Sequence, residues 1–404
     1  MKKLVLFGAG KIGRSFIGQL FATSGFEVVF IDISESVIND LNRLNEYKVV
    51  IKSSQPDEII KVGNVRGVLG EEVDKVTEEI SDCDIAAISV GQKGLPYVIN
   101  TLAKGLILRQ KKFGRKPLDI ILAENMHNAD KYVKDILNSI IGMDYPVDEL
   151  VGFIETSIGK MVPIMPKEVQ EKDVLLVYAE PYNTLILDKK AFKNPIPDIK
   201  GLAPKENMKA WVDRKSYIHN FGHAAAAYAG FLADPSVIYL SDVLKIHSVK
   251  KFTRAAMLQS ADVLMKKYPG EFTFFELSDH IDDLLSRFEN QALGDTVFRV
   301  GCDLKRKLHR DNRILSPMID GIQTRSPIDK ILLTFVYGLS FKAKDEYGNM
   351  YPGDIEFSKS LNNYGLSYVL SDFCELNATE DHKIISRIIS AYGRSLKKAQ
   401  MSPG

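Results

Sequence analysis

Short, almost wholly apolar runs recur through the first half of the chain, and stretches with helical periodicity separate them. Runs of this kind are typical of strands that are buried on both faces of a parallel sheet. A helical pattern over residues 13–25 follows the first run, and Gly25 is placed to end that helix. Strands that alternate with helices predict a doubly wound α/β sheet. The predicted strands lie within residues 2–10, 27–32, 84–91, 118–125, 150–166 and 174–181.

The stretch "KNPIPDIKGLAP", residues 193–204, is rich in proline and glycine and marks a change in the pattern. Beyond it, β-branched runs become rare and long helical periodicities begin. We therefore expect two domains, an α/β domain over residues 1–195 and a mostly α-helical domain over residues 196–404. The helical patterns cover residues 206–233, 248–268, 277–291 and 381–400.

The composition is that of an ordinary globular protein, with 45% hydrophobic and 26% charged residues among 404. A net charge of +1 favours neither nucleic acid nor an anionic membrane, and no stretch approaches the roughly 20 apolar residues of a membrane span. The apolar run in "MKKLVLFGAG" is too short for a signal peptide. Cys83, Cys302 and Cys374 form no CxxC pair, which argues against disulfides and structural zinc and fits a cytoplasmic protein. We expect a monomer or a dimer, and a solvated surface at the basic cluster around Arg109.

The first predicted strand leads into "GAGKIG", where three glycines have the spacing G-x-G-x-x-G. Between a strand and a helix, the first glycine allows a tight turn, the second lets the backbone approach a pyrophosphate, and the third lets helix and strand pack closely. The helix N-terminus adds N–H donors and the positive end of a dipole. This context makes the α/β domain Rossmann-type. The cofactor-binding residues predicted here are Gly8, Ala9, Gly10, Lys11, Ile12 and Gly13.

Asp32 ends the next predicted strand and bears on the identity of the dinucleotide. Its carboxylate can accept hydrogen bonds from a ribose diol, whereas a 2′-phosphate would meet its negative charge. No arginine follows at Ile33 or Ser34 to receive that phosphate. NAD rather than NADP is therefore the predicted cofactor. A flavin, another adenine-containing ligand, or a glycine-rich turn without a ligand are the alternatives.

Two more loops follow predicted strands, "SVGQKG" and "AENMHN". Ligands gather at the carboxyl ends of strands in open α/β sheets. We expect Ser89, Val90 and Gly91 to contact the dinucleotide through backbone groups. Glu124 is assigned to the cofactor site, and Asn125 both to that site and to the reacting centre as a hydrogen-bond donor. Ordinary connecting loops are the alternative.

In the second half, "DRKSYIHNFGHAAAAYAG" places polar groups before a run of alanines. At roughly 100° per residue, Lys215, Asn220 and His223 fall within an arc of about 140° on one helix, and Tyr217 and His219 point elsewhere. A lysine whose pKa is lowered by burial can accept the proton of an alcohol, and an asparagine N–H can hold the resulting oxygen. A surface lysine, a helix asparagine and a core histidine are the alternative, and close helix packing explains the alanines.

These residues resemble the signature of the polyol-specific long-chain dehydrogenases, the mannitol dehydrogenase family, in the form K-x4-N-x2-H. Further segments that resemble the family in order are "FGAGKIGRSFIG", "ENM", "RKSYIHNFGHAAAAYAG", "RFENQALGDTVFRVG" and "DLKRKLHRDNRILSP". The compact N-terminus is most similar to members that act on mannitol 1-phosphate. The resemblance implies NAD, no metal, and a substrate that is a hexitol or keto sugar, best matched by mannitol 1-phosphate and fructose 6-phosphate.

The resemblance also implies roles for single residues. Lys215 would be the general base, Asn125 and Asn220 would hold the reacting oxygen, and His223 would orient the substrate. Arg299 resembles the family's substrate-contacting arginine. A phosphate would need cations, with Lys305 and Arg306 as predicted substrate-binding residues beside further candidates at Lys307, Arg310 and Arg313.

One position departs from the family. Val212 stands where some members carry a glutamate that relays the proton, so proton exit must take another route. A uronate reductase of the tagaturonate or fructuronate type is one alternative function. A protein that senses NAD(H) without catalysis is another, because a fold alone does not fix a function.

Overall fold

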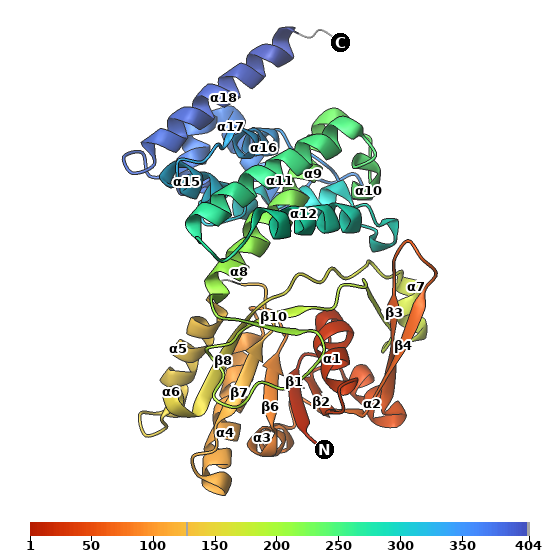
Figure 1. Cartoon of the computed structure of the whole chain (residues 1–404). Coiled ribbons are helices and arrows are strands. Elements are labelled where there is room, and N and C mark those ends of the chain that lie inside the picture. Colours follow the sequence, from red (N-terminus) through yellow and green to blue (C-terminus); the bar gives the residue numbers. More distant parts are fainter. Residues whose placement is uncertain (127, 402–404) are drawn as a thin grey trace. The chain divides into compact units, whose positions relative to one another are not determined.

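The computed structural model describes residues 1–126 and 128–401, which form two compact units divided between Val212 and Asp213 (Figure 1). The division falls inside helix α8 (Met208–Arg214). The first unit is built on a largely parallel sheet with helices on both faces, and the second is mostly helical. This confirms the predicted fold class, a Rossmann-type α/β domain followed by a helical domain.

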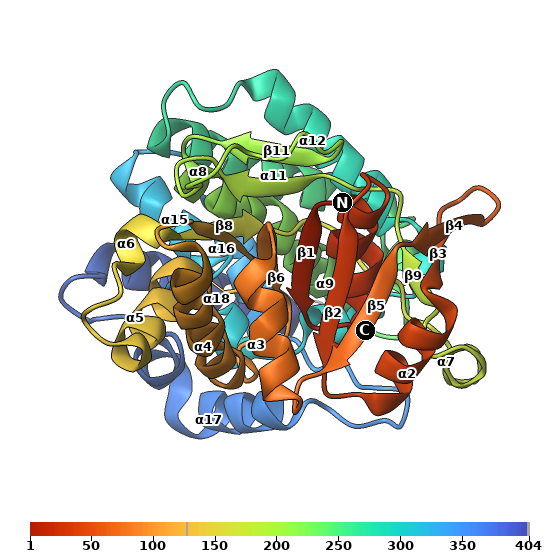
Figure 2. The same ribbon diagram turned by 90° about the horizontal axis from the view of Figure 1, so that it is seen from below.

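The main sheet of the first unit has eight strands in the order β11-β10-β8-β7-β6-β1-β2-β5. The six strands from β8 to β5 run parallel, whereas β10 is antiparallel to β8. Figure 2 shows β6, β1, β2 and β5 next to one another. The order reverses direction at β1, where ligands bind in open α/β sheets. The strands are β1 (Lys3–Phe7), β2 (Glu27–Asp32), β5 (Val65–Leu69), β6 (Ile85–Ile88), β7 (Leu118–Leu122), β8 (Val151–Ser157), β10 (Leu185–Asp188) and β11 (Leu202–Lys205).

Successive residues of the central strands feed two separate hydrophobic cores, because side chains alternate across a sheet. Leu4 and Leu6 of β1 join the core under the first helical turns, whereas Val5 and Phe7 join the core on the opposite face. Covering both faces explains why these strands are apolar at every position. The covering helices are η1 (Gly13–Gly18, a π-helical turn), α1 (Gln19–Ala22) and α2 (Glu35–Leu44) on one face, and α3 (Val73–Asp82), α4 (Leu95–Phe113) and α5 (Ala129–Ile141) on the other.

A second, three-stranded sheet has the order β4-β3-β9. It consists of β3 (Glu46–Ile51), β4 (Glu58–Gly63) and β9 (Val177–Ala179), so the run at residues 174–181 lies outside the main sheet. The sequence pattern did not reveal β3 and β4, whose outward positions carry charged residues such as Glu46 and Lys48. Short helices α6 (Val147–Leu150) and α7 (Lys167–Lys172) complete the unit.

The proline-rich stretch at residues 193–204 ends in the edge strand β11 instead of a linker. In this parallel pair Pro204 lies opposite Leu187 of β10, and an edge strand is where a sheet tolerates a proline. The sheet pairing therefore carries the first compact unit on to Val212.

The second unit is organised around α9 (Phe221–Ala233), which packs against α11, α13 and α16. Ala224, Ala225, Ala226 and Ala227 are all buried, so the alanine run serves close helix packing. A side chain at Gly230 would lie 2.2 Å from Val243 Cγ1. The other elements are η2 (Lys215–Asn220), α10 (Leu240–Val243), α11 (His247–Lys267), α12 (Phe274–Phe288), η3 (Gln291–Leu293), α13 (Val297–Gly301), α14 (Leu304–Lys307), α15 (Leu315–Gln323), α16 (Asp329–Leu339), α17 (Pro352–Tyr368), η4 (Val369–Phe373) and α18 (His382–Met401).

Across the described part of the chain, no helix has both the length and the apolar character that crossing a bilayer requires. The three cysteines are free thiols, of which Cys83 and Cys374 are buried.

The expectation of a solvated basic cluster is wrong for Arg109, which is 1% exposed. Its guanidinium donates to the carbonyls of Ser81, Cys83, Lys116 and Pro117 at 2.8–3.1 Å. A guanidinium that satisfies its donors on carbonyls can be buried without a carboxylate. Residues 111–116 are exposed, as the pattern predicts.

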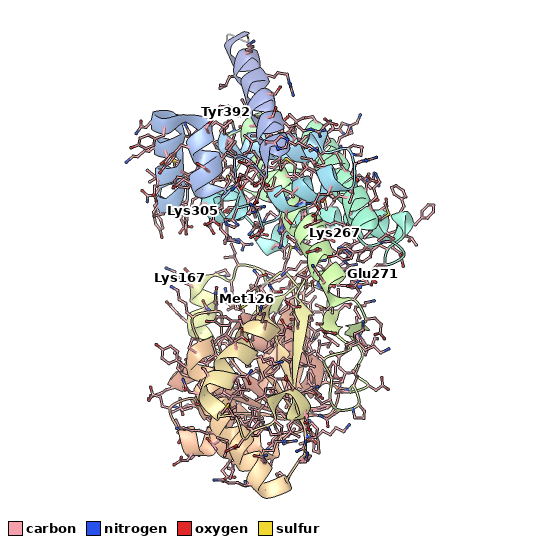
Figure 3. All side chains as sticks on the ribbon, turned by 90° about the vertical axis from the view of Figure 1, so that its left-hand side faces the viewer. Met126, Lys167, Lys267, Glu271, Lys305 and Tyr392 are labelled. Atoms are coloured by element: carbon pink, nitrogen blue, oxygen red, sulfur yellow. The ribbon has the colours of Figure 1, made fainter. Side chains whose placement is uncertain are left out.

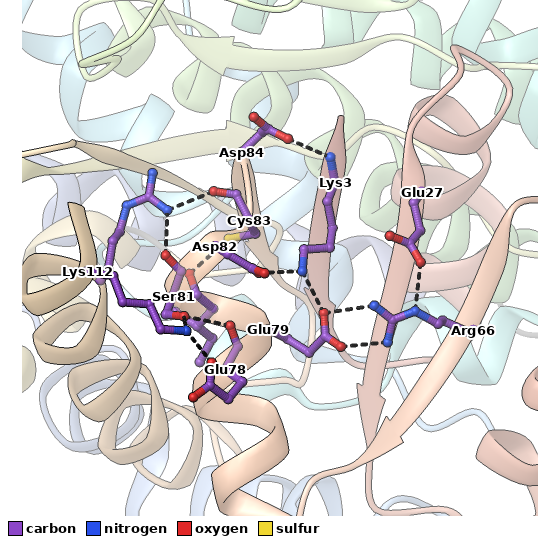
Figure 4. A network of polar contacts seen from close by, with 12 residues as sticks. Lys3, Glu27, Arg66, Glu78, Glu79, Ser81, Asp82, Cys83, Asp84 and Lys112 are labelled. Carbon is purple, nitrogen blue, oxygen red and sulfur yellow. Dashed lines mark hydrogen bonds and ion pairs between the residues drawn. The ribbon is translucent and has the colours of Figure 1, made fainter. Parts of the chain in front are cut away.

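An ion-pair network ties together the amino ends of β1, β2 and β5, away from the glycine-rich turn (Figure 4). Arg66 holds Glu79 through two nitrogens at 2.7 and 2.9 Å and Glu27 at 2.7 Å, and Lys3 reaches Glu79 at 2.8 Å. Burial raises the pKa of the Glu79 carboxyl, but hydrogen bonds from Arg66 and Lys3 outweigh burial and leave that pKa below its ordinary value.

We predict that Glu79→Gln lowers the free energy of unfolding by about 1–3 kcal/mol, because it breaks a half-buried, bidentate pair. Glu78→Gln on the same helix removes an exposed pair with Lys112 and should cost less than about 1 kcal/mol. Since the Glu79 pKa is lowered in the folded state, its contribution is present above the unfolded pKa and fades as the pH falls. Urea unfolding of the two variants at neutral and acidic pH tests this, and equal losses at neutral pH would contradict it.

Candidate active site

The glycine-rich turn of the first unit packs closely against its surroundings at two of its three glycines. Gly8 has φ +97°, and a Cβ there would lie 2.2 Å from Ser89 O in the loop after β6. A Cβ on Gly13 would lie 2.0 Å from Gly8 O. Gly10 is different, because nothing stands within 4 Å of its would-be Cβ. The backbone at Gly10 therefore faces open space, as a pyrophosphate-binding turn requires.

This open space belongs to a cleft of about 810 Å³ at the carboxyl ends of β1, β2 and β6. Of the residues predicted for the cofactor, five line the cleft, namely Gly8, Gly10, Asp32, Ser89 and Val90. Ala9 is buried, Lys11 is exposed, Ile12 packs on the core beneath, and Gly13 supports the turn. Sequence reasoning missed Gly70, Glu71, Lys93, Tyr97 and Thr101, which also line the cleft. Gly70 and Glu71 follow β5, so recognising that strand would have found them.

Asp32 accepts hydrogen bonds from the backbone of the glycine-rich turn and of its own loop. Its Oδ2 accepts from the N–H of Ala9 at 2.7 Å, and its Oδ1 accepts from the N–H of Ser34 at 3.0 Å. A carboxylate has about four acceptor positions, so capacity for ribose hydroxyls remains in the cleft wall.

Glu124 is buried and binds the neighbouring loop instead of pointing into solvent. Its Oε1 accepts from the N–H groups of Val90 at 2.8 Å and Gly91 at 3.0 Å, so these two donors are already in use. Burial raises the pKa of Glu124, and the two backbone hydrogen bonds oppose that rise. Glu124 thus fixes the loop that carries Ser89. Asn125 follows it as an exposed residue.

In the second unit, Lys215 and Asn220 begin and end the π-helical turn η2. Such turns repeat their hydrogen bonds every five residues and often occur at functional sites. Residues five apart, as these two are, therefore lie over one another more closely than in an α-helix. Lys215, Asn220 and His223 are all half-buried.

Lys215 has the electrostatic character of a base. Burial, and after it the positive charge of Arg313, lowers the pKa of Lys215 to about 8. An amine of that pKa is partly uncharged near neutral pH, whereas an ordinary lysine is fully protonated.

His223 lies in a ring cluster with His219 and Phe288. The Phe288 ring stacks on His223 at 3.9 Å between centroids, and the His219 ring lies 5.2 Å from it. The expectation that His219 points elsewhere is wrong, because residues four apart, as His219 and His223 are, already share one face of a helix. Burial, followed by nearby cations led by Arg299, lowers the pKa of His223, so its imidazole is neutral. Its Nε2 is buried without a hydrogen-bond partner among the described residues, with Asp295 at 3.8 Å.

A polar network anchors the back of η2. The hydroxyl of Tyr217 bonds Ser316 at 2.8 Å and donates to Asp320. Lys267 links Asp320 at 2.7 Å, Tyr217 at 3.0 Å and Asp213 at 2.8 Å. These contacts fix the turn on α11 and α15 and so hold the backbone that carries Lys215.

The basic residues of this unit separate into two groups. Lys305 (labelled in Figure 3) and Arg306, both predicted to bind substrate, are exposed on α14. Lys305 lies over the Phe373 ring at 5.3 Å, and Arg306 pairs with Asp303. Arg299 pairs with Asp295. Lys307 and Arg313 instead lie inward, at the end of α14 and before α15.

Within the described residues, no three His, Cys, Asp or Glu side chains are grouped so that they could hold a metal ion. That the protein needs no metal ion stays a prediction from the family resemblance.

Comparison with known proteins identifies the class. Residues 2–201 match the mannitol dehydrogenase Rossmann domain, and residues 207–387 match the mannitol dehydrogenase C-terminal domain. The chain belongs to the mannitol dehydrogenase family.

One solved structure supports the same fold, and a second is less similar. The Pseudomonas fluorescens mannitol 2-dehydrogenase, in a ternary complex with NAD and D-mannitol, is 16% identical with a TM-score of 0.74, over 100% of this chain and 95% of that one. A 2-dehydropantoate 2-reductase from Geobacter metallireducens is 14% identical with a TM-score of 0.47, over 84% and 99% of the two chains. The first of these likenesses shows that the arrangement of elements is shared.

The glycine geometry predicts different costs for two neighbouring substitutions. Gly8→Ala should lower the free energy of unfolding by at least about 2 kcal/mol, because a positive φ and a clash with the Ser89 carbonyl oppose it. Gly10→Ala should cost less than about 1 kcal/mol, since its Cβ meets open space. Urea unfolding without nucleotide measures both, and equal destabilisation would contradict the geometry.

Proposed function

We propose that this protein is an NAD-dependent polyol dehydrogenase, and that its substrate pair is mannitol 1-phosphate and fructose 6-phosphate. The named activity is that of mannitol-1-phosphate 5-dehydrogenase. The observation that carries the proposal is Lys215, an amine with a pKa of about 8 on the π-helical turn that also holds Asn220. Family membership and the NAD and D-mannitol bound by the Pseudomonas fluorescens enzyme support it.

The first unit fits a dinucleotide. The open space at Gly10 suits a pyrophosphate, and Asp32 in the cleft wall suits a ribose diol and opposes a 2′-phosphate. Tyr97 and Val98, which also line the cleft, add apolar surface suited to a flat aromatic ring. When bound, NAD supplies the hydride acceptor for alcohol oxidation and, as NADH, the donor for reduction.

The side chains of this protein would then manage the proton and the oxygen. Lys215 as free amine takes the proton of the substrate hydroxyl, and as ammonium returns it to the carbonyl oxygen in reduction. The side-chain N–H groups of Asn220 and Asn125 stabilise the charge that grows on that oxygen. The neutral imidazole of His223 offers one donor and one acceptor, which suits substrate hydroxyls. Proton release passes from Lys215 to water, since Val212 cannot relay it.

The pH dependence follows from the state of Lys215. Oxidation needs the free amine, so its kcat/KM should rise with pH and level off above about 8. Reduction needs the ammonium, so its kcat/KM should fall as the pH rises through about 8.

We predict that Lys215→Met lowers kcat for fructose 6-phosphate reduction by about 10²–10⁴-fold and removes the limb near pH 8. NADH affinity should be unchanged, because Lys215 holds the substrate and not the dinucleotide. Lys209→Met, at an exposed lysine, is the matched control and should keep full activity. Steady-state kinetics and NADH titration over pH 6–10 make the measurement.

A panel of keto substrates separates the alternatives. Faster NADH oxidation with tagaturonate or fructuronate than with fructose 6-phosphate would favour a uronate reductase. NADH binding without turnover of any of them, unaffected by Lys215→Met, would favour a non-catalytic sensor.

A further inference from the structure

Arg313 is a half-buried cation that lacks an acidic partner. Its Nη1 points to the carbonyl of Asn220 at 3.4 Å, and its Nε donates to Asn312 Oδ1 at 3.0 Å. No carboxylate within the described ranges pairs with it. Other arginines of the same unit are paired, since Arg254 donates to Asp282 at 2.7 and 2.8 Å and Arg310 donates to Asp381 at 3.1 Å.

Lys307 is 4% exposed and lies close enough to Arg313 for their charges to interact. Its amine donates to the carbonyls of Val300, at 2.6 Å, and Cys302, with no carboxylate partner in the described chain. Burial, and next the charge of Arg313, lowers the pKa of Lys307 to about 7. Burial, and next the charge of Arg306, lowers the pKa of Arg313 to about 10. Among the described residues, neither of these two inward cations forms a direct pair with a carboxylate, and the charge of Asp303 offsets only part of the effect that lowers their pKa values.

Arg313 lies next to the residues that we propose carry out the reaction. Arg313 touches the backbone of Asn220, which ends the turn that Lys215 begins. Arg313 is also the nearby charge that helps to lower the pKa of Lys215. A ligand group held by Arg313 would therefore lie beside the residues that we assign to the reacting oxygen.

The amount of charge distinguishes the possible anions. A carboxylate carries a single negative charge, whereas a phosphate monoester carries about −1.5 to −2 near pH 7 and has three acceptor oxygens. The guanidinium of Arg313 and the partly protonated amine of Lys307 together favour the second, because they supply more than one positive charge. A guanidinium can bind two phosphate oxygens at once in a fixed geometry, and Lys307 behind it would add positive charge when protonated.

We propose that Arg313 binds the phosphate of the substrate, and that it thereby selects phosphorylated over plain polyols. This assignment rests on the proposed function for the identity of the substrate. It differs from the sequence-based expectation, which placed the substrate-binding cations at Lys305 and Arg306.

The test compares Arg313→Gln with Arg254→Gln, which removes the same charge from an arginine paired with Asp282 in the same unit. Arg313→Gln should raise KM for fructose 6-phosphate about 100-fold, with kcat/KM for fructose changed less than about 3-fold. Arg254→Gln should change neither. Arg313→Lys keeps the charge without the planar guanidinium and should give an intermediate KM. Thermal melting of each variant checks that the unit remains folded.

A binding experiment keeps this result separate from the proposed function. Inorganic phosphate titrated by calorimetry should bind the wild type and Arg254→Gln, and should bind Arg313→Gln about 10-fold or more weakly. Equal phosphate binding by all three proteins, or equal KM effects of the two substitutions, would overturn the assignment. A loss confined to fructuronate or tagaturonate reduction would overturn the choice of phosphate. Absence of any polyol turnover would refute the proposed function, while Arg313-dependent phosphate binding would still support the anion site.

Discussion

The proposed chemistry depends on one constraint, which is that the amine of Lys215 must lose its proton near neutral pH. Two features of the second unit bring this about, partial burial of the amine and the positive charge of the Arg313 guanidinium, which pairs with no carboxylate in the described part of the chain. Each disfavours the ammonium, because each makes a positive charge at that position more costly. The charge of Arg313, unlike the burial, would also attract an anion to this place. A phosphate bound to Arg313 would offset the second feature, so the pKa of about 8 belongs to the free protein, which is the state that kcat/KM reports.

The packing of the second unit holds the backbone of η2 in a fixed position. Tyr217, Lys267 and Asp320 hold η2 from behind, and the alanines of α9 allow neighbouring helices to approach closely. In the first unit, carboxylates likewise fix the loops that follow the strands. Asp32 braces the glycine-rich turn through Ala9, and Glu124 braces the loop at Val90 and Gly91. Carboxylates that hold backbone N–H groups leave the binding surfaces in fixed positions.

Much of the fold could be predicted from the sequence, because fully buried parallel strands and long amphipathic helices leave strong patterns. β3 and β4 escaped notice because charged residues interrupt their apolar pattern, and β11 because its proline suggested a linker. Arg109 appeared solvated because a sequence cannot show the four carbonyls that surround it. In the candidate site, motif spacing identified Lys215, Asn220 and His223. It could not distinguish the outward cations Lys305 and Arg306 from the inward Lys307 and Arg313, since that depends on tertiary packing. The π-helical turn also lay beyond a count made with α-helical geometry, whereas the contact of His219 with His223 follows from their spacing of four residues.

The most direct measurement is the titration of the Lys215 amine itself, by competitive labelling with acetic anhydride over pH 6–11 and mass spectrometry of the peptide that contains it. The account predicts half-maximal reactivity near pH 8. A midpoint near pH 10.5, the ordinary value for a lysine, would contradict it.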